Sequence, residues 1–163
     1  MKLKHYLIFM IFMIFMPTFV IASGTHKHSH DAESFSVGEP GKGKPDRQIK
    51  VSMLDTMRFV FEPELKSPKH GETIEFIVTN DGAIQHEFSI GNALDQVKHA
   101  EMMRKMPDMV HQDPNTVSLA SGETARLSWR FMGNDTVVFA CNIPGHFEAG
   151  MKHVLPITAA ANN

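Results

Sequence analysis

The sequence predicts an all-β protein, a two-layer β-sandwich with one short helix inserted between two of its strands. From residue 49 onward, short runs rich in β-branched and aromatic residues alternate with turn residues. In several runs the apolar residues occupy every second position, as in a strand with one buried face. One stretch, Ala93–Lys105, holds good helix formers and no turn residues instead. Strands at this spacing are typical of a β-sandwich.

Turn residues bound the expected strands in chain order. The runs expected to form strands cover residues 49–53, 59–61, 73–79, 84–90, 125–131 and 136–141. The turn residues that separate them are Pro63, Gly71, Asn80-Asp-Gly82, Ser121-Gly122 and Gly133-Asn134. The expected helix, Ala93–Lys105, lies between the fourth and fifth runs. Pro107 is expected to end it, because proline cannot continue a helix.

The first 22 residues are interpreted as a secretory signal peptide. Lys2 and Lys4 give a positively charged start, and residues 6–20 form an almost unbroken apolar run. Small residues follow, and cleavage is expected after Ala22, with Ser23 as the alternative. The apolar run is short for a membrane span, so an uncleaved anchor is the less favoured interpretation. We therefore expect an exported protein that is not held in a membrane after cleavage.

Residues 23–47 are expected to be a disordered arm, and residues 48–163 to be the folded domain. The segment His26-Lys-His-Ser-His30 has no apolar period, and residues 38–45 are rich in glycine and proline, which disfavour a helix or a central strand. Loss of the two signal-peptide lysines changes the formal net charge from −2 to −4. Because no basic stripe remains, nucleic acid is not an expected partner.

The C-terminal part of the chain holds Cys141, His146 and Met151 at Cys-x4-His-x4-Met spacing. Cys141 is the only cysteine, whereas exported proteins usually use cysteines in pairs. A buried inert thiol or half of an intermolecular disulfide would explain a single cysteine. A metal ligand explains it better, because a histidine and a methionine follow at regular spacing.

A second histidine, His86, lies on the apolar face of the strand expected at 84–90, and Cys141 lies on the apolar face of the last expected strand. These two residues are therefore expected to meet inside one end of the sandwich. Two imidazoles, a thiolate and a weak thioether form the ligand set of a blue-copper electron-transfer centre. Zinc more often takes four strong ligands without a thioether. The residues expected to hold one copper are His86, Cys141, His146 and Met151.

The segment from residue 49 to residue 158 resembles the cupredoxins, the family of plastocyanin, azurin, auracyanin and rusticyanin. Its Cys-x4-His-x4-Met loop is similar to that of the auracyanins and rusticyanin, and Phe61-Glu-Pro63 and Gly71-Glu-Thr-Ile-Glu-Phe76 resemble the early strands of the family. The resemblance implies a Greek-key β-sandwich with a type 1 copper. The His-rich leader and the Met-rich insert at 99–107 are similar to those of bacterial periplasmic cupredoxins tied to copper tolerance.

One position departs from the pattern of that family. Many cupredoxins carry Asn or Ser directly after the first histidine ligand, and here that residue is Glu87. An acidic neighbour favours the more positive Cu(II) form and alters the hydrogen bonding near the sulfur. Glu148 adds a second carboxylate inside the ligand loop. The resemblance therefore leaves the colour of the centre, blue or green, and its reduction potential open.

Two further groups of residues are candidates for weaker copper binding. The arm presents the imidazoles of His26, His28 and His30, a pattern that favours weak metal binding, with a solvated linker as the alternative. The second group lies in the Met-rich insert and offers thioethers, which suit Cu(I). Its members are His99, Met102, Met103, Met106, Met109 and His111. A methionine-lined core face is the favoured interpretation of this second group.

These observations predict a periplasmic type 1 copper protein that acts in copper tolerance by electron transfer, by copper sequestration or by both. The alternatives are a respiratory electron carrier unrelated to tolerance and, less favoured, a copper oxidase. An enzyme is not expected, because a multicopper oxidase needs several His-x-His pairs and the only such pairs lie in the arm. The expected partners are copper ions and a redox partner protein, and the protein is expected to be a monomer.

Overall fold

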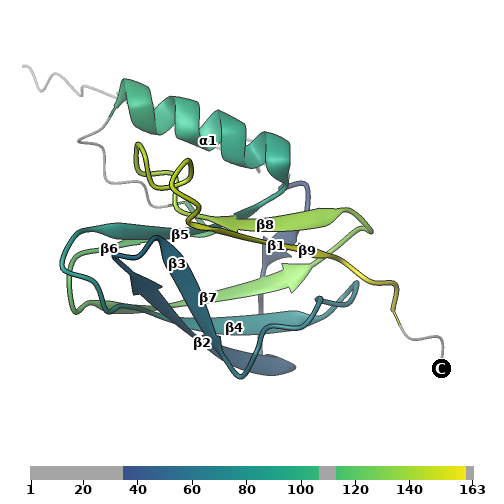
Figure 1. The fold of residues 1–163 in the computed structure, drawn as a ribbon. Coiled ribbons are helices and arrows are strands. Elements are labelled where there is room, and N and C mark those ends of the chain that lie inside the picture. Colours follow the sequence, from purple (N-terminus) through teal and green to yellow (C-terminus); the bar gives the residue numbers. More distant parts are fainter. Residues whose placement is uncertain (1–34, 107–112, 161–163) are drawn as a thin grey trace, which may run out of the picture. The chain divides into compact units, whose positions relative to one another are not determined.

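The computed structural model describes residues 35–106 and 113–160, which form two β-sheets and one helix (Figure 1). These residues belong to one compact unit, Ala32–Asn163. The predicted signal peptide and residues 23–34 of the predicted arm lie outside the described residues, as do Pro107, Met109 and His111. Within the described part of the chain, no helix has both the length and the apolar character that a membrane crossing requires.

In this part of the chain the strands form one five-stranded and one four-stranded sheet. The strand order in the first sheet is β1 (Gly38–Pro40), β7 (Thr124–Phe131), β4 (Thr73–Asn80), β2 (Arg47–Leu54) and β3 (Arg58–Glu62). The order in the second sheet is β6 (Thr116–Leu119), β5 (His86–Gly91), β8 (Thr136–Ala140) and β9 (Lys152–Pro156). Strands β2 and β4 are parallel, and all other neighbours are antiparallel. The sheets pack face to face, and helix α1 (Ala93–Lys105) covers the outer face of the second sheet at β5 and β8 (Figure 1).

The core between the two sheets is built from the inward-facing residues of both. Its five largest fully buried side chains are all aromatic: Trp129, Phe76, Phe88, Phe131 and Phe139. The rings of Phe88 on β5 and Phe139 on β8 are stacked, with centroids 5.6 Å apart and an interplanar angle of 18°. Full burial of one such side chain stabilises the fold by about 1.5–3 kcal/mol. This stacked pair therefore joins the neighbouring strands β5 and β8 inside the core.

The predicted all-β sandwich with one inserted helix is confirmed, and the predicted helix has the bounds found in the structure. Helix α1 begins at a capping box, in which the Asn92 side chain accepts the N–H of Asp95 and the Asp95 carboxylate accepts the N–H of Asn92. Each expected strand overlaps an observed one. The short strands β1, β6 and β9 were not predicted, and Ile84 lies before β5, where its side chain is 46% exposed.

The prediction of a disordered arm over residues 23–47 is wrong for the described end of that segment. Strand β1 pairs with β7, with Gly38 opposite Phe131, and Val37 is fully buried. Gly38 has φ of 146°, and a Cβ there would lie 2.1 Å from the carbonyl oxygen of Arg130, so this position requires glycine. Glycine and proline do disfavour a central strand, but an edge strand such as β1 tolerates both. The folded domain therefore begins before residue 48.

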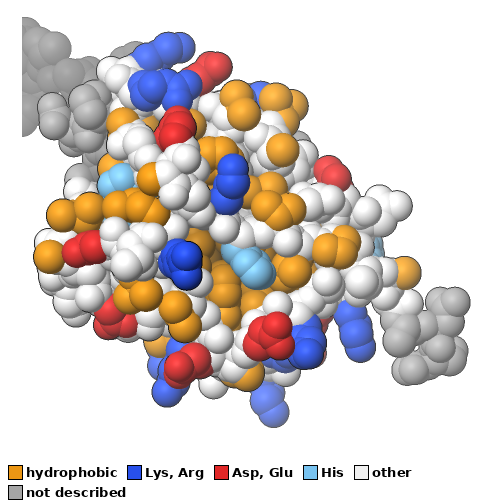
Figure 2. Space-filling model, in the orientation of Figure 1, with side chains coloured by type: hydrophobic (Ala, Val, Ile, Leu, Met, Phe, Trp, Pro, Cys, Tyr) orange, Lys and Arg blue, Asp and Glu red, His pale blue; other side chains and the backbone are white. Residues whose placement is uncertain are grey.

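Helix α1 covers a polar face of β5. Glu87 and Ser89 lie on the side of β5 that faces away from the core, and α1 buries both of them. The residues that α1 itself buries are Gln96 and Met103, whereas its Val97 is 54% exposed. In the side view of Figure 2, acidic, basic and apolar side chains are interspersed over the surface. The helix is thus attached to the sheet largely through polar contacts.

Candidate metal centre

Three of the four predicted ligand residues meet at one end of the sandwich. His86 is the first residue of β5, Cys141 directly follows β8, and His146 lies in the loop between β8 and β9. One potential ligand atom from each of the three lies within 4.8 Å of the other two. The Cys141 sulfur is 3.3 Å from Nδ1 of His146, and the rings of His86 and His146 have centroids 5.0 Å apart. His86 and Cys141 are fully buried, whereas His146 is half-buried.

The loop from Cys141 to Met151 (the ligand loop) folds back on itself and returns Met151 to the other ligands. The N–H of Cys141 donates to the carbonyl of Met151 at 3.1 Å, and the N–H of Met151 donates to the carbonyl of His146 at 3.0 Å. Gly145 and Gly150 adopt φ of 91° and 106°, conformations that favour glycine, and these residues permit the two turns. Met151 is fully buried. The fourth predicted residue is therefore held by backbone hydrogen bonds to two of the other three.

The ring of His86 is oriented by the carboxylate of Asp55, which lies in the turn between β2 and β3. Nε2 of His86 lies 3.0 Å from Oδ1 of Asp55, and Asp55 also accepts the N–H of Ala83 at 2.8 Å. Nδ1 of His86 is buried and has no hydrogen-bond partner among the residues that the structure describes. A carboxylate on one ring nitrogen and a free lone pair on the other is the arrangement of a metal-binding histidine. The site therefore fits a metal ion, with Nδ1 of His86 as the ligand atom.

Asp55 was not identified in the sequence, because it lies in the β2–β3 turn, far along the chain from His86. The N–H of Ala83 and the ring of His86 hold the pKa of Asp55 below its ordinary value through hydrogen bonds. Asp55 is thus ionised at neutral pH and accepts the proton of Nε2. No isolated sequence signal distinguishes this aspartate from other turn residues.

The thiol of Cys141 is buried at the base of the site. Burial raises its pKa to about 12, although the N–H groups of Glu87 and Ile143 act in the opposite direction. The N–H of Glu87 donates to the sulfur at 3.3 Å. The backbone of Glu87, the residue after the first histidine, is thus bonded to the sulfur, whereas its carboxylate lies on the other side of β5. Without a metal ion the thiol is therefore neutral at physiological pH.

Copper affinity is expected to rise with pH, because a thiolate ligand must lose the proton that the free thiol holds. The pKa of His146 is lowered by burial and by the neighbouring His86, so its imidazole is already neutral at pH 7. Above about pH 7.5, where imidazoles are ordinarily neutral, the apparent association constant should rise about tenfold per pH unit.

Titration calorimetry in buffers of different ionisation enthalpy would count the protons released on copper binding. One proton per copper is expected at about pH 8, where only the thiol still carries a proton to displace. Release of no proton under these conditions would contradict ligation by the Cys141 thiolate.

The structure describes only some residues of the two predicted accessory copper-binding groups, and these residues have different surroundings. Nε2 of His99 lies 3.1 Å from both carboxylate oxygens of Glu87, so this histidine points to the sheet and not along a methionine face. Met103 is buried and Met102 half-buried, as expected for core packing, whereas Met106 is 38% exposed. The remaining members, Met109 and His111 of the insert and His26, His28 and His30 of the arm, lie outside the described residues.

The fold and the four residues His86, Cys141, His146 and Met151 define the class of protein, a cupredoxin with a site typical of a type 1 copper. No family model matches the chain. It is 45% identical over 125 residues to the copper-resistant cuproprotein CopI of Rubrivivax gelatinosus, which covers 76% of this chain and 74% of that protein. It is 44% identical over 116 residues to CopI of Vibrio cholerae serotype O1, with 71% and 68% covered. The chain belongs to the family of CopI copper-resistance cuproproteins.

Solved structures share the fold at lower identity. An auracyanin from Roseiflexus castenholzii superposes with a TM-score of 0.56 and 22% identity, covering 72% of this chain and 99% of that chain. Auracyanin B superposes with a TM-score of 0.57 and 21% identity, covering 74% of this chain and 96% of that chain. The resemblance to cupredoxins expected from the sequence is therefore confirmed.

Replacement of Met151 by leucine is expected to leave copper bound and to raise its reduction potential. A thioether in this position bonds weakly, and leucine nearly conserves the buried volume, so the other three ligands should hold the metal. Loss of an electron-pair donor disfavours Cu(II) more than Cu(I), which raises the potential. Cyclic voltammetry and the visible spectrum of the Met151→Leu protein measure the two effects. Complete loss of copper would instead make Met151 a main ligand.

Proposed function

We propose that this protein is a periplasmic type 1 copper protein that acts in copper tolerance, by electron transfer, by copper sequestration or by both. The observation that carries the proposal is the buried Nδ1 of His86, which has no partner among the described residues and lies beside the thiol of Cys141 and the ring of His146. A buried polar atom without a partner costs free energy, and a bound metal ion removes that cost. Soft sulfur and two imidazoles favour copper.

In this proposal His86, Cys141 and His146 are the strong ligands and Met151 is the weak axial one. A bound copper supplies reversible one-electron chemistry between Cu(II) and Cu(I). The protein holds the ligands still during that exchange, because Asp55 fixes the ring of His86 and backbone hydrogen bonds fix the ligand loop. The half-buried ring of His146 is the ligand most accessible to a redox partner protein.

The role in tolerance is supported by the family, whose members from Rubrivivax gelatinosus and Vibrio cholerae are named copper-resistant cuproproteins. The periplasmic location is supported by the charged start and apolar run of residues 1–22. Cell fractionation and the N-terminal sequence of the mature protein test the location and distinguish cleavage after Ala22 from cleavage after Ser23.

A gene-deletion strain tests the role in the cell. It is expected to be sensitive to added copper and to grow normally without it, and the intact gene should restore growth. A gene carrying His146→Ala should fail to restore it. The matched control is His70→Ala, since His70 is an exposed histidine far from the ligand loop in the sequence. The His70→Ala gene should restore tolerance at equal protein levels.

Two results would contradict the proposal. A deletion strain that resists copper normally but respires poorly would favour the respiratory electron carrier. Rescue of tolerance by the His146→Ala gene would show that tolerance does not require the metal centre.

A further inference from the structure

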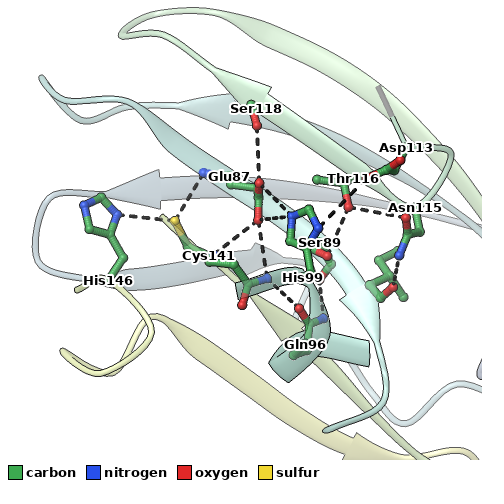
Figure 3. A network of polar contacts seen from close by, with 12 residues as sticks. Glu87, Ser89, Gln96, His99, Asp113, Asn115, Thr116, Ser118, Cys141 and His146 are labelled. Carbon is green, nitrogen blue, oxygen red and sulfur yellow. Dashed lines mark hydrogen bonds and ion pairs between the residues drawn. The ribbon is translucent and has the colours of Figure 1, made fainter. Parts of the chain in front are cut away.

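A buried carboxylate lies directly behind the metal centre. Glu87 follows His86 in β5, and because side chains alternate along a strand it points to the opposite face, beneath α1 (Figure 3). Its side chain is fully buried. It accepts hydrogen bonds from the N–H of Asn142 at 3.2 Å, from Nε2 of His99 at 3.1 Å and from the Ser118 hydroxyl at 3.4 Å. A buried carboxylate is tolerated only when such partners satisfy it.

The partner that can offset the charge of Glu87 is His99, which α1 contributes. Burial acts to lower the pKa of His99, but the hydrogen bond and charge of Glu87, together with the charge of Asp113, outweigh it and raise the pKa above its ordinary value. Asp113 Oδ2 lies 3.9 Å from Nδ1 of His99, on the far side of the ring from Glu87. Below about pH 6.5, the ordinary pKa of histidine, His99 therefore carries a positive charge in the contact with Glu87.

Glu87 also contacts the sulfur of Cys141, the proposed metal ligand. The backbone N–H of Glu87 donates to Cys141 Sγ, and its carboxylate accepts the N–H of Asn142, the residue directly after Cys141. Helix α1 makes a second connection here, because Oε1 of Gln96 accepts from the side-chain amide of Asn142 at 2.6 Å. The segment that carries the thiol is thus bonded to α1 both directly and through Glu87 (Figure 3).

We propose that Glu87 and His99 are positioning residues for the copper–thiolate unit, an internal ion pair through which helix α1 sets the reduction potential of the metal. The inference rests on the proposed ligation of copper by Cys141. A negative charge near the metal favours Cu(II), and the adjacent positive charge of His99 offsets that effect. The pair also fixes the backbone donor of Glu87 on the sulfur, and such hydrogen bonds tune a metal–thiolate centre.

Single substitutions of the two members should shift the potential in opposite directions. His99→Gln leaves the carboxylate buried without its positive partner, so the potential should fall. Glu87→Gln keeps the shape and an acceptor for Asn142 but removes the negative charge, so the potential should rise. The double variant should lie between the two single variants. The matched control is Glu101→Gln, an exposed carboxylate on the same helix, which should leave the potential unchanged.

Cyclic voltammetry at about pH 6, below the ordinary pKa of histidine, is the primary measurement, and the thiolate-to-copper band and one copper per chain are recorded for each variant. Shifts of the same sign in both single variants, or no shift in either, would overturn the inference, because a purely structural role gives no reversal of sign. If Glu87→Gln does not fold, His99→Lys replaces it in the comparison. The lysine variant keeps a positive charge and should retain a potential closer to that of the natural protein than His99→Gln does. Equal potentials for these two would overturn the inference.

Failure of the inference and failure of the proposed function give different results. If the natural protein itself shows no thiolate-to-copper band, ligation by Cys141 is wrong. If the natural protein shows the band and binds one copper, but the sign reversal is absent, only the role of Glu87 and His99 is wrong.

Discussion

Replacement of Cys141 by serine is expected to abolish the thiolate-to-copper absorption band and to lower copper affinity by more than about 100-fold, since even the loss of a residue that only orients a ligand costs 10–100-fold. Cys141 is the only cysteine in the chain, so no second sulfur can form a thiolate bond. Serine is close in size, which keeps the fully buried position filled. Any loss of colour therefore reports on the metal bond and not on a cavity.

The visible spectrum after one equivalent of Cu(II) measures the effect of Cys141→Ser, and circular dichroism verifies the fold. Met151→Leu is the matched control, since it changes another buried residue of the ligand loop and should retain an intense band. An intense band in the Cys141→Ser protein would show that the centre is not built on this sulfur.

Replacement of Phe139 by alanine is expected to lower the free energy of unfolding of the copper-free protein by about 3–5 kcal/mol. Phe139 is fully buried, stacks on Phe88 and also packs edge-on against Phe76 at a centroid distance of 5.5 Å. The substitution thus opens a cavity where both sheets contact each other. Since domains of this size are stable by about 5–15 kcal/mol, much of the stability would be lost.

Urea denaturation measures this change, and Val154→Ala is its surface control. Val154 lies on the neighbouring strand β9 and is 51% exposed, so its truncation should change the free energy of unfolding by less than about 0.5 kcal/mol. A loss for Phe139→Ala as small as that of the control would mean that the two sheets do not depend on this contact.

Much of the fold and the metal centre followed from local pattern. The longer strands carry apolar residues at every second position, the helix Ala93–Lys105 holds good helix formers without turn residues, and the ligand loop has a distinctive spacing. Strand β1 was predicted to be part of a disordered arm because it contains glycine and proline. The sequence does not indicate that β1 lies at the edge of a sheet, where both residues are tolerated. The four-residue strand β6 is too short to show a period.

The residues that surround the ligands could not be predicted in the same way. Asp55 reaches His86 across the sandwich from a turn, and Glu87 meets His99 only because α1 folds over β5. Both contacts depend on tertiary packing between distant parts of the chain, and such packing produces no periodic pattern in the sequence. The sequence identified Glu87 as an unusual residue for the family, but it did not predict that Glu87 is buried or that it contacts His99.

The alternation of His86 and Glu87 along β5 has a consequence for the evolution of the family. In β5, antiparallel pairing places Ser89 opposite Ala140 and Ile90 opposite Phe139, so the register with β8 decides which residue faces Cys141. A slip of one residue would turn His86 toward α1 and bring the carboxylate of Glu87 to the metal. An insertion or deletion of one residue within β5 would therefore replace the imidazole of His86 by the carboxylate of Glu87 at the metal. Changes of length should accumulate in the surface loops and be rare in this strand.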